Sequence, residues 1–592
     1  MLRKDTQQPD KEEKMVSSIR VDRNIPVRMR DGVVLRADVY RPDDSEKHPA
    51  IVVRTPYNKV HSVASDYLSP IEAAFAGYAV VIQDTRGRFA SEGEFVPGAP
   101  EGKDGYDTIE FVAAEPWCDG NVGMAGASYL ARNQWQAAIE NPPHLKAIAP
   151  HVIGAGMLGE AEMCGVKEVE TTLSWFANMA FDTLSRMAKQ GKDVSKALEN
   201  IRYVLNNFEE VCNYLPLKEI PYFKFEGMEQ WFQRRLSYEN IKGIKSEEEL
   251  FWPYEKVKVP IMHSCGWYDM SVGHTFLNFL NMREKGGSQI AREGQHVFMG
   301  PWVHGARLHN FIGALNFGVY ASGAGAFATE RHIQFFDKYL RGIDSPYLVP
   351  IRYFVMGLNR WRSATTWPLP ETQWQRFYLH SRGHANSATG DGLLSRNEPG
   401  TEPPDIYVYN PHDPVPTRGG RLNPDLNQPA GPQDQSIIER RNDVLCYSTP
   451  ELEEDMEITG PLKLHLFAST SAKDTDFFVK LTDVYPNGMS INVAEGCIRA
   501  RYRKSVLRPE LVTPGEINEY VIDLASTSNL FRKGHRIRID ITSSNFPRFE
   551  RNMNTGNPAG EDARGIPAMQ TIFHDSQYAS YIDFPVIPPT KR

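Results

Sequence analysis

The 592-residue sequence lacks the long apolar runs that carry a chain into or across a membrane. No run approaches the roughly 20 apolar residues of a membrane-spanning helix. The first 18 residues, MLRKDTQQPDKEEKMVSS, are charged throughout and contain no apolar segment of a secretory signal. We therefore expect a cytoplasmic protein with no membrane partner, in which residues 1–17 form a disordered leader.

Paired cysteines and basic blocks are also missing. The six cysteines are scattered without one Cys-x-x-Cys pair, which favours reduced thiols over disulfides or a zinc site. No His-Glu-x-x-His motif occurs, and His380 and His384 flank a predicted turn, so we expect no metal and no other cofactor. The 66 basic and 74 acidic residues give a net charge of −8 without a basic block, which argues against a nucleic-acid partner.

The sequence does contain alternating strand and helix signals between residues 20 and 150. Short apolar runs such as AIVVRTPY (50–57) and YAVVIQDTRG (78–87) alternate with segments of helical spacing. Apolar runs of this length between helices are typical of a mostly parallel sheet covered on both faces. A chain of this length is too long for one core, so we expect two or three domains.

Two changes of pattern divide the rest of the chain. Residues 155–254 read as polar helices without a convincing strand, after which strand signals return. We predict a helical lid inserted into one α/β domain that spans 18–345. Residues 346–592 contain many short strands and few helices. This pattern predicts an all-β jelly-roll domain at the C-terminus.

One corner between a strand and a helix draws attention to Ser128. In VGMAGASYLARNQW (122–135), a buried strand ends, a sharp turn follows, and a helix begins at Tyr129. Gly126 stands two residues before the serine, which is the context of a nucleophile elbow. The alternative is that Ser128 is a helix N-cap, a common role for serine.

Two later strands supply partners for such a nucleophile. The strand PIMHSCGWYD ends at Asp269, and the strand HVFMGPWVH is followed by His304. In an α/β-hydrolase the nucleophile, the acid and the histidine follow in this order, each at the carboxyl end of a strand. The coincidence of order and strand ends favours a Ser128–Asp269–His304 triad over a helix cap.

Several motifs resemble the cocaine esterase family of α/β-hydrolases. That group includes α-amino-acid ester hydrolases, glutaryl acylases and, more distantly, X-prolyl dipeptidyl-peptidases. The resemblance runs from about residue 20 to 590 and is carried by these segments: RTPY (54–57), QDTRGRFASEGEF (83–95), GASY (126–129), GWYD (266–269), GPWVH (300–304), DTDFFVKLTDVYPNG (474–488) and SSNFPRFERNMNTG (543–556).

The resemblance implies a role for each site residue. It implies Ser128 as the nucleophile, His304 as general base and then general acid, and Asp269 as the residue that orients His304. It also implies an oxyanion hole formed by the Tyr57 hydroxyl and the backbone N–H of Tyr129; without the resemblance, Tyr57 reads as a turn residue after a proline.

These observations predict a serine hydrolase that cleaves small-molecule carboxylic esters, or activated amides, through an acyl-enzyme on Ser128. An extra N-terminal domain typical of X-prolyl dipeptidyl-peptidases is not found, which favours esters over peptides. The alternatives are an X-prolyl dipeptidyl-peptidase-like or acylase-type amide hydrolase, and a non-catalytic binding protein on a hydrolase scaffold. The natural substrate and the oligomeric state, a homo-oligomer included, stay open.

Some local expectations concern the lid and the elbow. Trp175, Phe176 and Trp231 are candidates to line a substrate pocket, and packing of the lid core is the alternative. The resemblance to amino-acid ester hydrolases implies that carboxylates of the lid could recognise a free α-amino group, but a solvated helical face is the preferred interpretation for the four acidic residues available there: Glu160, Glu162, Glu168 and Glu170. Asp84 and Arg86 are expected to form a buried ion pair. At the elbow, Leu130 and Ala131 stand at positions where glycine is usual. We therefore expect the local packing to have room for their side chains.

Overall fold

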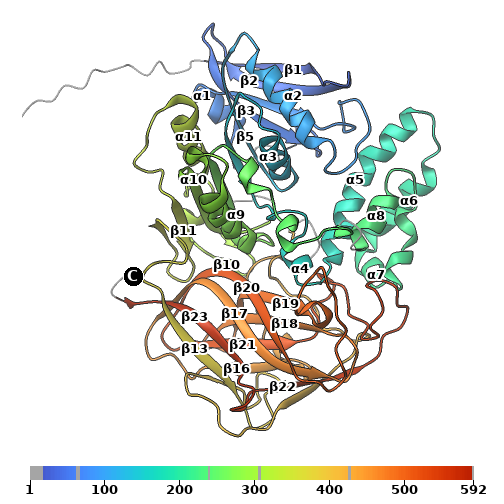
Figure 1. Cartoon of the computed structure of the whole chain (residues 1–592), viewed down its shortest axis with the longest axis vertical. Helices are drawn as coiled ribbons and strands as arrows, with labels where there is room; N and C mark the ends of the chain where they lie inside the picture. Colours follow the sequence, from blue (N-terminus) through green and yellow to red (C-terminus); the bar gives the residue numbers. More distant parts are fainter. Residues whose placement is uncertain (1–17, 62–66, 238–240, 305–308, 424–428, 590–592) are drawn as a thin grey trace, which may run out of the picture.

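A long mixed sheet runs through the first part of the chain (Figure 1). The structure, a computed structural model, describes residues 18–61, 67–237, 241–304, 309–423 and 429–589, so the predicted leader at 1–17 lies outside it. The ten strands of the sheet are, in spatial order, β1 (Ile19–Arg28), β2 (Val34–Pro42), β4 (Ala79–Asp84), β3 (His48–Thr55), β5 (Cys118–Ala127), β6 (Leu145–His151), β7 (Ile261–Tyr268), β8 (Gln295–Val303), β11 (Ile351–Val355) and β12 (Arg360–Ala364).

The strands from β4 to β11 are parallel, and helices cover them on both faces. Alternate residues of a strand point to opposite faces, and β3 shows this, because Ile51 and Val53 join one apolar core and Val52 joins the other. The predicted parallel α/β domain is confirmed. Its helices are α1 (Pro70–Phe75), α2 (Glu101–Ala113), α3 (Tyr129–Ile139), α9 (Val272–Lys285), α10 (Gln289–Glu293) and α11 (Ala328–Phe336).

A helical insertion separates β6 from β7, and its described residues contain no strand longer than an isolated bridge. It has an apolar core of its own, in which Leu173, Phe176 and Phe232 are almost fully buried. Its elements are α4 (Glu160–Met163), α5 (Val169–Lys189), α6 (Ser195–Asn206), α7 (Phe208–Cys212), η2 (Leu217–Glu219), η3 (Pro221–Phe223), α8 (Glu229–Leu236), η5 (Glu247–Leu250) and η6 (Tyr254–Lys256).

The C-terminal part is a second, eleven-stranded system that is almost entirely antiparallel. Its strands are β13 (Gln373–His380), β14 (Leu393–Ser395), β15 (Asp405–Tyr409), β16 (Leu445–Ser448), β17 (Met456–Thr470), β18 (Asp476–Val484), β19 (Ser490–Arg499), β20 (Asn518–Phe531), β21 (Arg536–Thr542), β22 (Ala568–Phe573) and β23 (Tyr581–Ile587). Leu462, Leu464 and Leu466 of one strand, β17, are fully buried on one face, and every residue of β18 is buried.

The first sheet extends past residue 345, where the sequence placed the end of the α/β domain. Strands β11 and β12 lie beyond that point and pair at the β8 edge. A hairpin of short strands is not distinguishable in sequence from the β-rich segment that follows it.

The remaining short elements are β9 (Phe311–Ile312), β10 (Leu315–Asn316), η7 (Val319–Ala321), the π-helical turn η8 (Asp337–Arg341), η9 (Ile438–Arg440) and η10 (Ala500–Tyr502).

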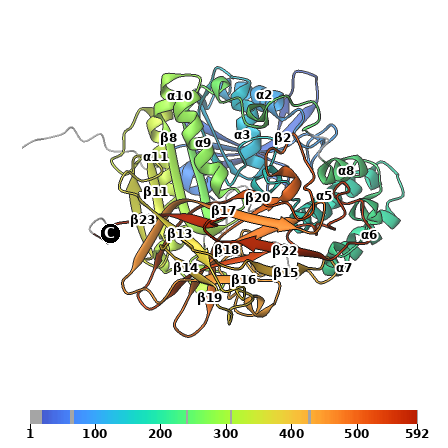
Figure 2. The same cartoon turned by 60° about the horizontal axis from the view of Figure 1, so that its bottom comes forward.

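The helical insertion lies against the β-rich part as well as the α/β part, as Figures 1 and 2 both show. The Val169 N–H donates to the Arg548 carbonyl at 2.9 Å, and Lys218 Nζ lies 2.5 Å from a carboxylate oxygen of Glu561.

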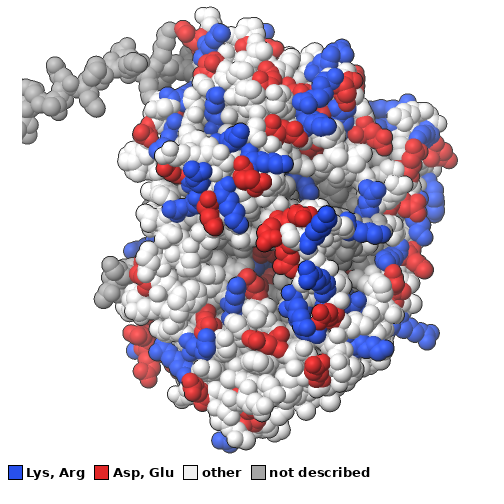
Figure 3. Space-filling view, in the orientation of Figure 1, with Lys and Arg blue, Asp and Glu red and all other residues white. Residues whose placement is uncertain are grey.

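On the surface of the molecule, Lys, Arg, Asp and Glu are interspersed over the face drawn in Figure 3. None of the described helices combines the length and apolar composition that crossing a membrane would require.

Candidate active site

The corner at Ser128 is strained. Ser128 sits between β5 and α3 with φ 57° and ψ −116°, a conformation that a non-glycine residue adopts at a cost. Its side chain makes no helix-capping hydrogen bond. Strain of this kind persists where the surrounding structure enforces it, as at a nucleophile elbow. Because the capping hydrogen bond is missing, the helix-cap interpretation is not supported.

Gly126 and the neighbouring backbone make the corner possible. Gly126 has φ +133°, and a Cβ there would come within 2.6 Å of Leu130 Cβ. The Ser128 N–H donates to the His151 carbonyl at 2.9 Å, which ties the corner to β6. Leu130 and Ala131 are both fully buried, so the elbow accepts them where glycine is usual.

The structure brings Ser128, His304 and Asp269 together at the carboxyl ends of three parallel strands. His304 Nε2 lies 3.1 Å from Ser128 Oγ, and His304 Nδ1 lies 2.9 Å from Asp269 Oδ2. Asp269 is fully buried, and its second oxygen accepts the Ser271 N–H at 2.8 Å. A carboxylate at Nδ1 favours the tautomer whose Nε2 lone pair faces the serine hydroxyl.

Tyr57 and Tyr129 are the two residues predicted to form the oxyanion hole. Tyr57 follows β3, and its hydroxyl oxygen accepts a hydrogen bond of 3.1 Å from Trp175 Nε1. Tyr129 is the first residue of α3, where a backbone N–H has no acceptor within the helix. The Tyr129 side chain points away, since its hydroxyl donates to Glu101 Oε1 at 3.0 Å.

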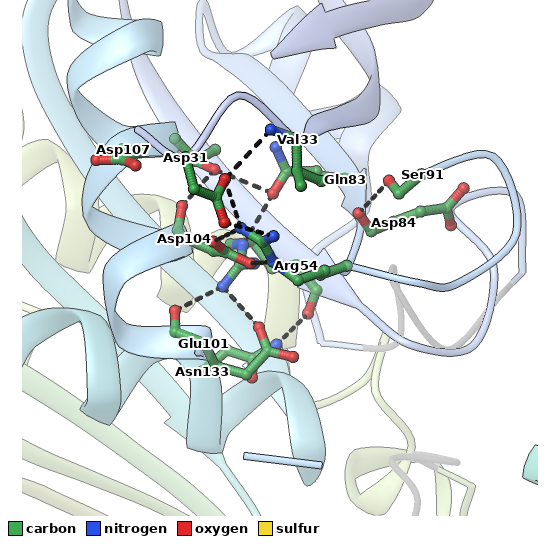
Figure 4. A network of polar contacts seen from close by, with 12 residues as sticks. Asp31, Val33, Arg54, Gln83, Asp84, Ser91, Glu101, Asp104, Asp107 and Asn133 are labelled. Atoms are coloured by element: carbon green, nitrogen blue, oxygen red, sulfur yellow. Dashed lines mark hydrogen bonds and ion pairs between the residues drawn. The ribbon is translucent and has the colours of Figure 1, made fainter. Parts of the chain in front are cut away.

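A buried polar network behind the elbow was not anticipated from the sequence (Figure 4). Arg54 of β3 is fully buried; its Nε donates to Gln83 Oε1 at 2.8 Å, and its Nη1 lies 2.8 Å from Glu101 Oε2. The Asn133 amide donates to the Arg54 carbonyl at 3.0 Å. Burial raises the pKa of Glu101, and Arg54 opposes that shift. The network holds α2 and α3 against the sheet, and the one signal for it was an arginine inside an apolar strand.

The expected ion pair between Asp84 and Arg86 is wrong. Asp84 instead accepts the Lys59 N–H at 2.7 Å and lies 3.6 Å from Lys59 Nζ. Arg86 turns to α2, where it makes two hydrogen bonds to Asp104 at 2.7 and 2.9 Å, and it lies 2.7 Å from Asp31. Both side chains find partners in other segments, which local sequence does not reveal.

The three aromatic candidates of the insertion lie in different environments. Trp175 is half-buried and reaches Tyr57 through its indole N–H. Trp231 packs edge-on against Phe95 with ring centroids 5.2 Å apart. Phe176 is 3% exposed, within the core of the insertion. Of the three, Trp175 is the one that the structure ties to a predicted site residue.

The four glutamates at the start of the insertion do not form a solvated face, so that expectation is wrong. Although burial opposes ionisation, Arg235 and Lys167 lower the pKa of Glu162 to about 2. Glu170 is 1% exposed, and burial raises its pKa to about 7. Glu168 lies 3.5 Å from Arg548, which belongs to the β-rich part. These glutamates are buried because the insertion is covered by segments distant in sequence.

The chain is similar to known proteins over nearly its whole length. The family model "X-Pro dipeptidyl-peptidase (S15 family)" matches residues 31–306, and "X-Pro dipeptidyl-peptidase C-terminal non-catalytic domain" matches residues 348–583. The cocaine esterase of Rhodococcus sp. (strain MB1 Bresler) is 38% identical over 573 residues, which cover 95% of this chain and 98% of that protein.

Two solved structures share the fold over nearly the whole chain. An aminopeptidase from a marine sediment archaeon, Thaumarchaeota archaeon, has a TM-score of 0.77 at 23% identity and covers 99% of both chains. An α-amino acid ester hydrolase has a TM-score of 0.75 at 24% identity and covers 98% of this chain and 100% of its own. At this level of identity the likeness establishes the fold alone.

Proposed function

The chain belongs to the cocaine esterase family and is a serine esterase, and on this basis we propose that it hydrolyses small carboxylic esters through an acyl-enzyme on Ser128. His304 acts as general base and then general acid, and Asp269 orients it. The observation that carries the proposal is the continuous contact from Ser128 Oγ through His304 to Asp269, at 3.1 and 2.9 Å. Nucleophile and base within hydrogen-bond reach, with the base held by a third group, are the signature of an activated serine.

The reaction follows from these contacts. Ser128 Oγ attacks the ester carbonyl carbon while its proton passes to His304 Nε2. The tetrahedral intermediate collapses, the bond to the alcohol oxygen breaks, and the proton on Nε2 passes to that oxygen. Water then repeats the sequence on the acyl-enzyme, which releases the carboxylic acid and restores the Ser128 hydroxyl.

The negative charge on the tetrahedral intermediate needs donors. We assign these to the Tyr57 hydroxyl and the backbone N–H of Tyr129, the first N–H of α3. Donors aimed at the developing oxyanion contribute more to the transition state than to the bound ester, which is how they raise kcat. The hydrogen bond from Trp175 supports this role, because a phenol oxygen that accepts one bond directs its own proton elsewhere.

The parts of the chain take roles around this site. The helical insertion, residues 155–254, serves as a lid over the α/β-hydrolase domain, whose sheet continues past residue 345 to β12, and the hydrogen bond from Trp175 to Tyr57 joins the two. The strands from β13 onward form a jelly-roll domain that supports the lid through contacts such as that of Val169 with Arg548.

A second candidate is amide hydrolysis of the X-prolyl dipeptidyl-peptidase or acylase type. The match of the X-Pro dipeptidyl-peptidase model to residues 31–306 favours it. Ester hydrolysis is preferred because the relative at 38% identity over 95% of the chain is an esterase. The strained backbone at Ser128 and the contact of its hydroxyl with His304 are features of a catalytic site, which argues against a non-catalytic binding protein.

The proposal is tested with Ser128→Ala and a matched control. Ser128→Ala should lower kcat on a p-nitrophenyl ester by about 10⁶-fold, since triad members act as a unit. Ser288 also follows a glycine two residues earlier, but it caps α10 by accepting the Ala291 N–H, so Ser288→Ala should leave the rate unchanged. A panel of matched esters and anilides, assayed side by side, decides between esterase and amidase. Retention of more than a few per cent of the activity by Ser128→Ala would remove Ser128 as the nucleophile.

A further inference from the structure

A pocket of about 450 Å³ lies between α9, the start of the insertion and strands β17–β20 of the β-rich part. Met270, directly after Asp269, lines it, but among the described residues that line it are neither Ser128 nor His304 nor Tyr57. Its walls are largely apolar and are formed chiefly by Phe251, Phe276, Leu277, Trp367, Phe478 and Phe549. A mostly apolar pocket with a few converging polar groups is the usual form of a small-molecule site.

The polar groups of this pocket include an arginine whose donors are not all used. Arg421 is 5% exposed; its Nη2 donates to the Leu524 carbonyl at 2.6 Å and its backbone N–H donates to Glu495 at 2.7 Å. Its Nη1 lies 3.7 Å from Glu160, beyond hydrogen-bond range. Within the described part of the chain, its buried Nε has no hydrogen-bond partner. Because Nε is enclosed by protein atoms, the donor left for an acceptor from outside the chain is Nη1.

A second arginine of the pocket shows the same feature. Arg548 is 4% exposed, and its Nη1 makes a close ion pair with Glu495, while its Nη2 lies 3.5 Å from Glu168. Its Nε is buried and, in the ranges that the structure describes, without a hydrogen-bond partner. Lys480 adds a third buried cation, whose Nζ donates to Gln435 at 2.9 Å. The described lining of the pocket therefore contains three buried cations and four carboxyl groups, those of Glu160, Glu168, Glu495 and Asp523.

Glu160 is the carboxyl group that lies beside Arg421 Nη1. Its Oε1 accepts the His274 N–H at 2.8 Å, and burial raises its pKa to about 8, with Arg421 opposing and Asp523 and Asp269 adding to the shift. The carboxyl of Glu160 is thus largely protonated at pH 7. A protonated carboxyl is a hydrogen-bond donor, so Glu160 and Arg421 present donors at the same end of the pocket.

We propose that this pocket is a binding site, separate from Ser128, for a carboxylate with an apolar, preferably aromatic, body. The carboxylate binds to Arg421 and is shared with the carboxyl of Glu160, and the body packs among Phe276, Trp367 and Phe549. A guanidinium edge matches the two oxygens of a carboxylate. The anion supplies an acceptor within hydrogen-bond range of Arg421 Nη1, whose contact with Glu160 is 3.7 Å long.

The experiment is calorimetric titration with 4-phenylbutyrate, using the full-length Ser128→Ala protein so that the result does not depend on turnover. The acid should bind to wild type and Ser128→Ala with equal affinity, whereas the neutral amide of the same acid should bind at least tenfold more weakly. Arg421→Met should weaken binding of the acid at least tenfold. Lys463→Met removes an exposed cation of the same pocket and should leave the affinity unchanged.

A second measurement covers the case in which Arg421→Met does not fold. Affinity for the acid should fall in wild type between pH 7 and pH 9, as Glu160 ionises, and should change much less in Glu160→Gln. The proposal is overturned if the amide binds as well as the acid, if Glu160→Gln and wild type share one pH profile, or if fluorophosphonate labelling of wild type abolishes binding, which would place the acid at Ser128. Failure of these tests leaves the triad proposal intact, because none of them measures turnover.

Discussion

Trp175 Nε1 and the Tyr57 hydroxyl oxygen lie 3.1 Å apart, although the two residues are 118 positions apart in sequence. One belongs to α5 of the insertion and the other follows β3 of the main sheet. The indole N–H has no acceptor role, so it donates and the phenol oxygen accepts. The contact fixes the direction of the Tyr57 hydroxyl and couples the insertion to the proposed oxyanion site.

Tyr57→Phe should therefore lower kcat without disturbing the fold. The substitution keeps the ring and deletes one donor to the oxyanion, which typically costs about 10²–10³-fold in kcat, or roughly 3–4 kcal/mol. KM and melting temperature should change little. A normal kcat would remove Tyr57 from the oxyanion hole, whereas a large fall in melting temperature with normal kcat would make it a structural residue.

Asp269→Asn tests how His304 is held. The amide preserves the shape of the side chain but no longer favours the tautomer with its proton on Nδ1, and in serine proteases the equivalent change costs about 10⁴ in kcat. We expect a loss of that order with normal substrate binding. Steady-state kinetics on the same ester suffice, and an unchanged kcat would mean that another acid orients His304.

Gly126→Ala should damage the elbow through both strain and contact. A Cβ at this position would lie 2.6 Å from Leu130 Cβ at φ +133°, and residues forced into such backbone regions cost about 1–3 kcal/mol. Gly191→Ala is the matched control, because Gly191 has φ +82° with nothing within 4 Å. Gly126→Ala should lower both stability and kcat, and equal stability losses in the two variants would contradict the role of the Leu130 contact.

Glu170 should make stability depend on pH. Its pKa is about 7 in the fold and near 4.5 when unfolded, so between these values the folded state holds a proton that the unfolded chain releases. Stability from this group is highest below pH 4.5 and falls by up to about 1.4 kcal/mol per pH unit as pH rises toward 7. Glu170→Gln should therefore gain stability relative to wild type between pH 5 and pH 8 in urea unfolding. Parallel curves for wild type and variant would contradict this.

The sequence was sufficient to predict the parallel sheet, the helical insertion and the positions of Ser128, Asp269 and His304. Each of these depends on local information, namely apolar runs, turns and the residues at strand ends. The pairing of β11 with β8 was not predictable, because the short strands after residue 345 have the same pattern as the β-rich segment that follows.

Burial of charged residues was the other feature that sequence did not show. The sequence pattern suggested a solvated helical face for Glu162 and Glu170. In the structure, Arg235 and Lys167 lower the pKa of Glu162, whereas burial raises the pKa of Glu170 and Arg548 opposes that shift. The same applies to Arg86, whose partner Asp104 lies on α2. Periodicity reports which face of a helix is apolar, but not which charged residues another segment will cover.

The most direct test of the central claim is to map the site of a covalent label. The wild-type protein is treated with a fluorophosphonate, digested, and analysed by mass spectrometry for the peptide that contains Ser128. The account predicts one phosphonyl group per chain, located on Ser128, with labelling abolished in Ser128→Ala and retained in Ser288→Ala. Stoichiometric labelling of a different residue, or no labelling of a protein that hydrolyses esters, would contradict it.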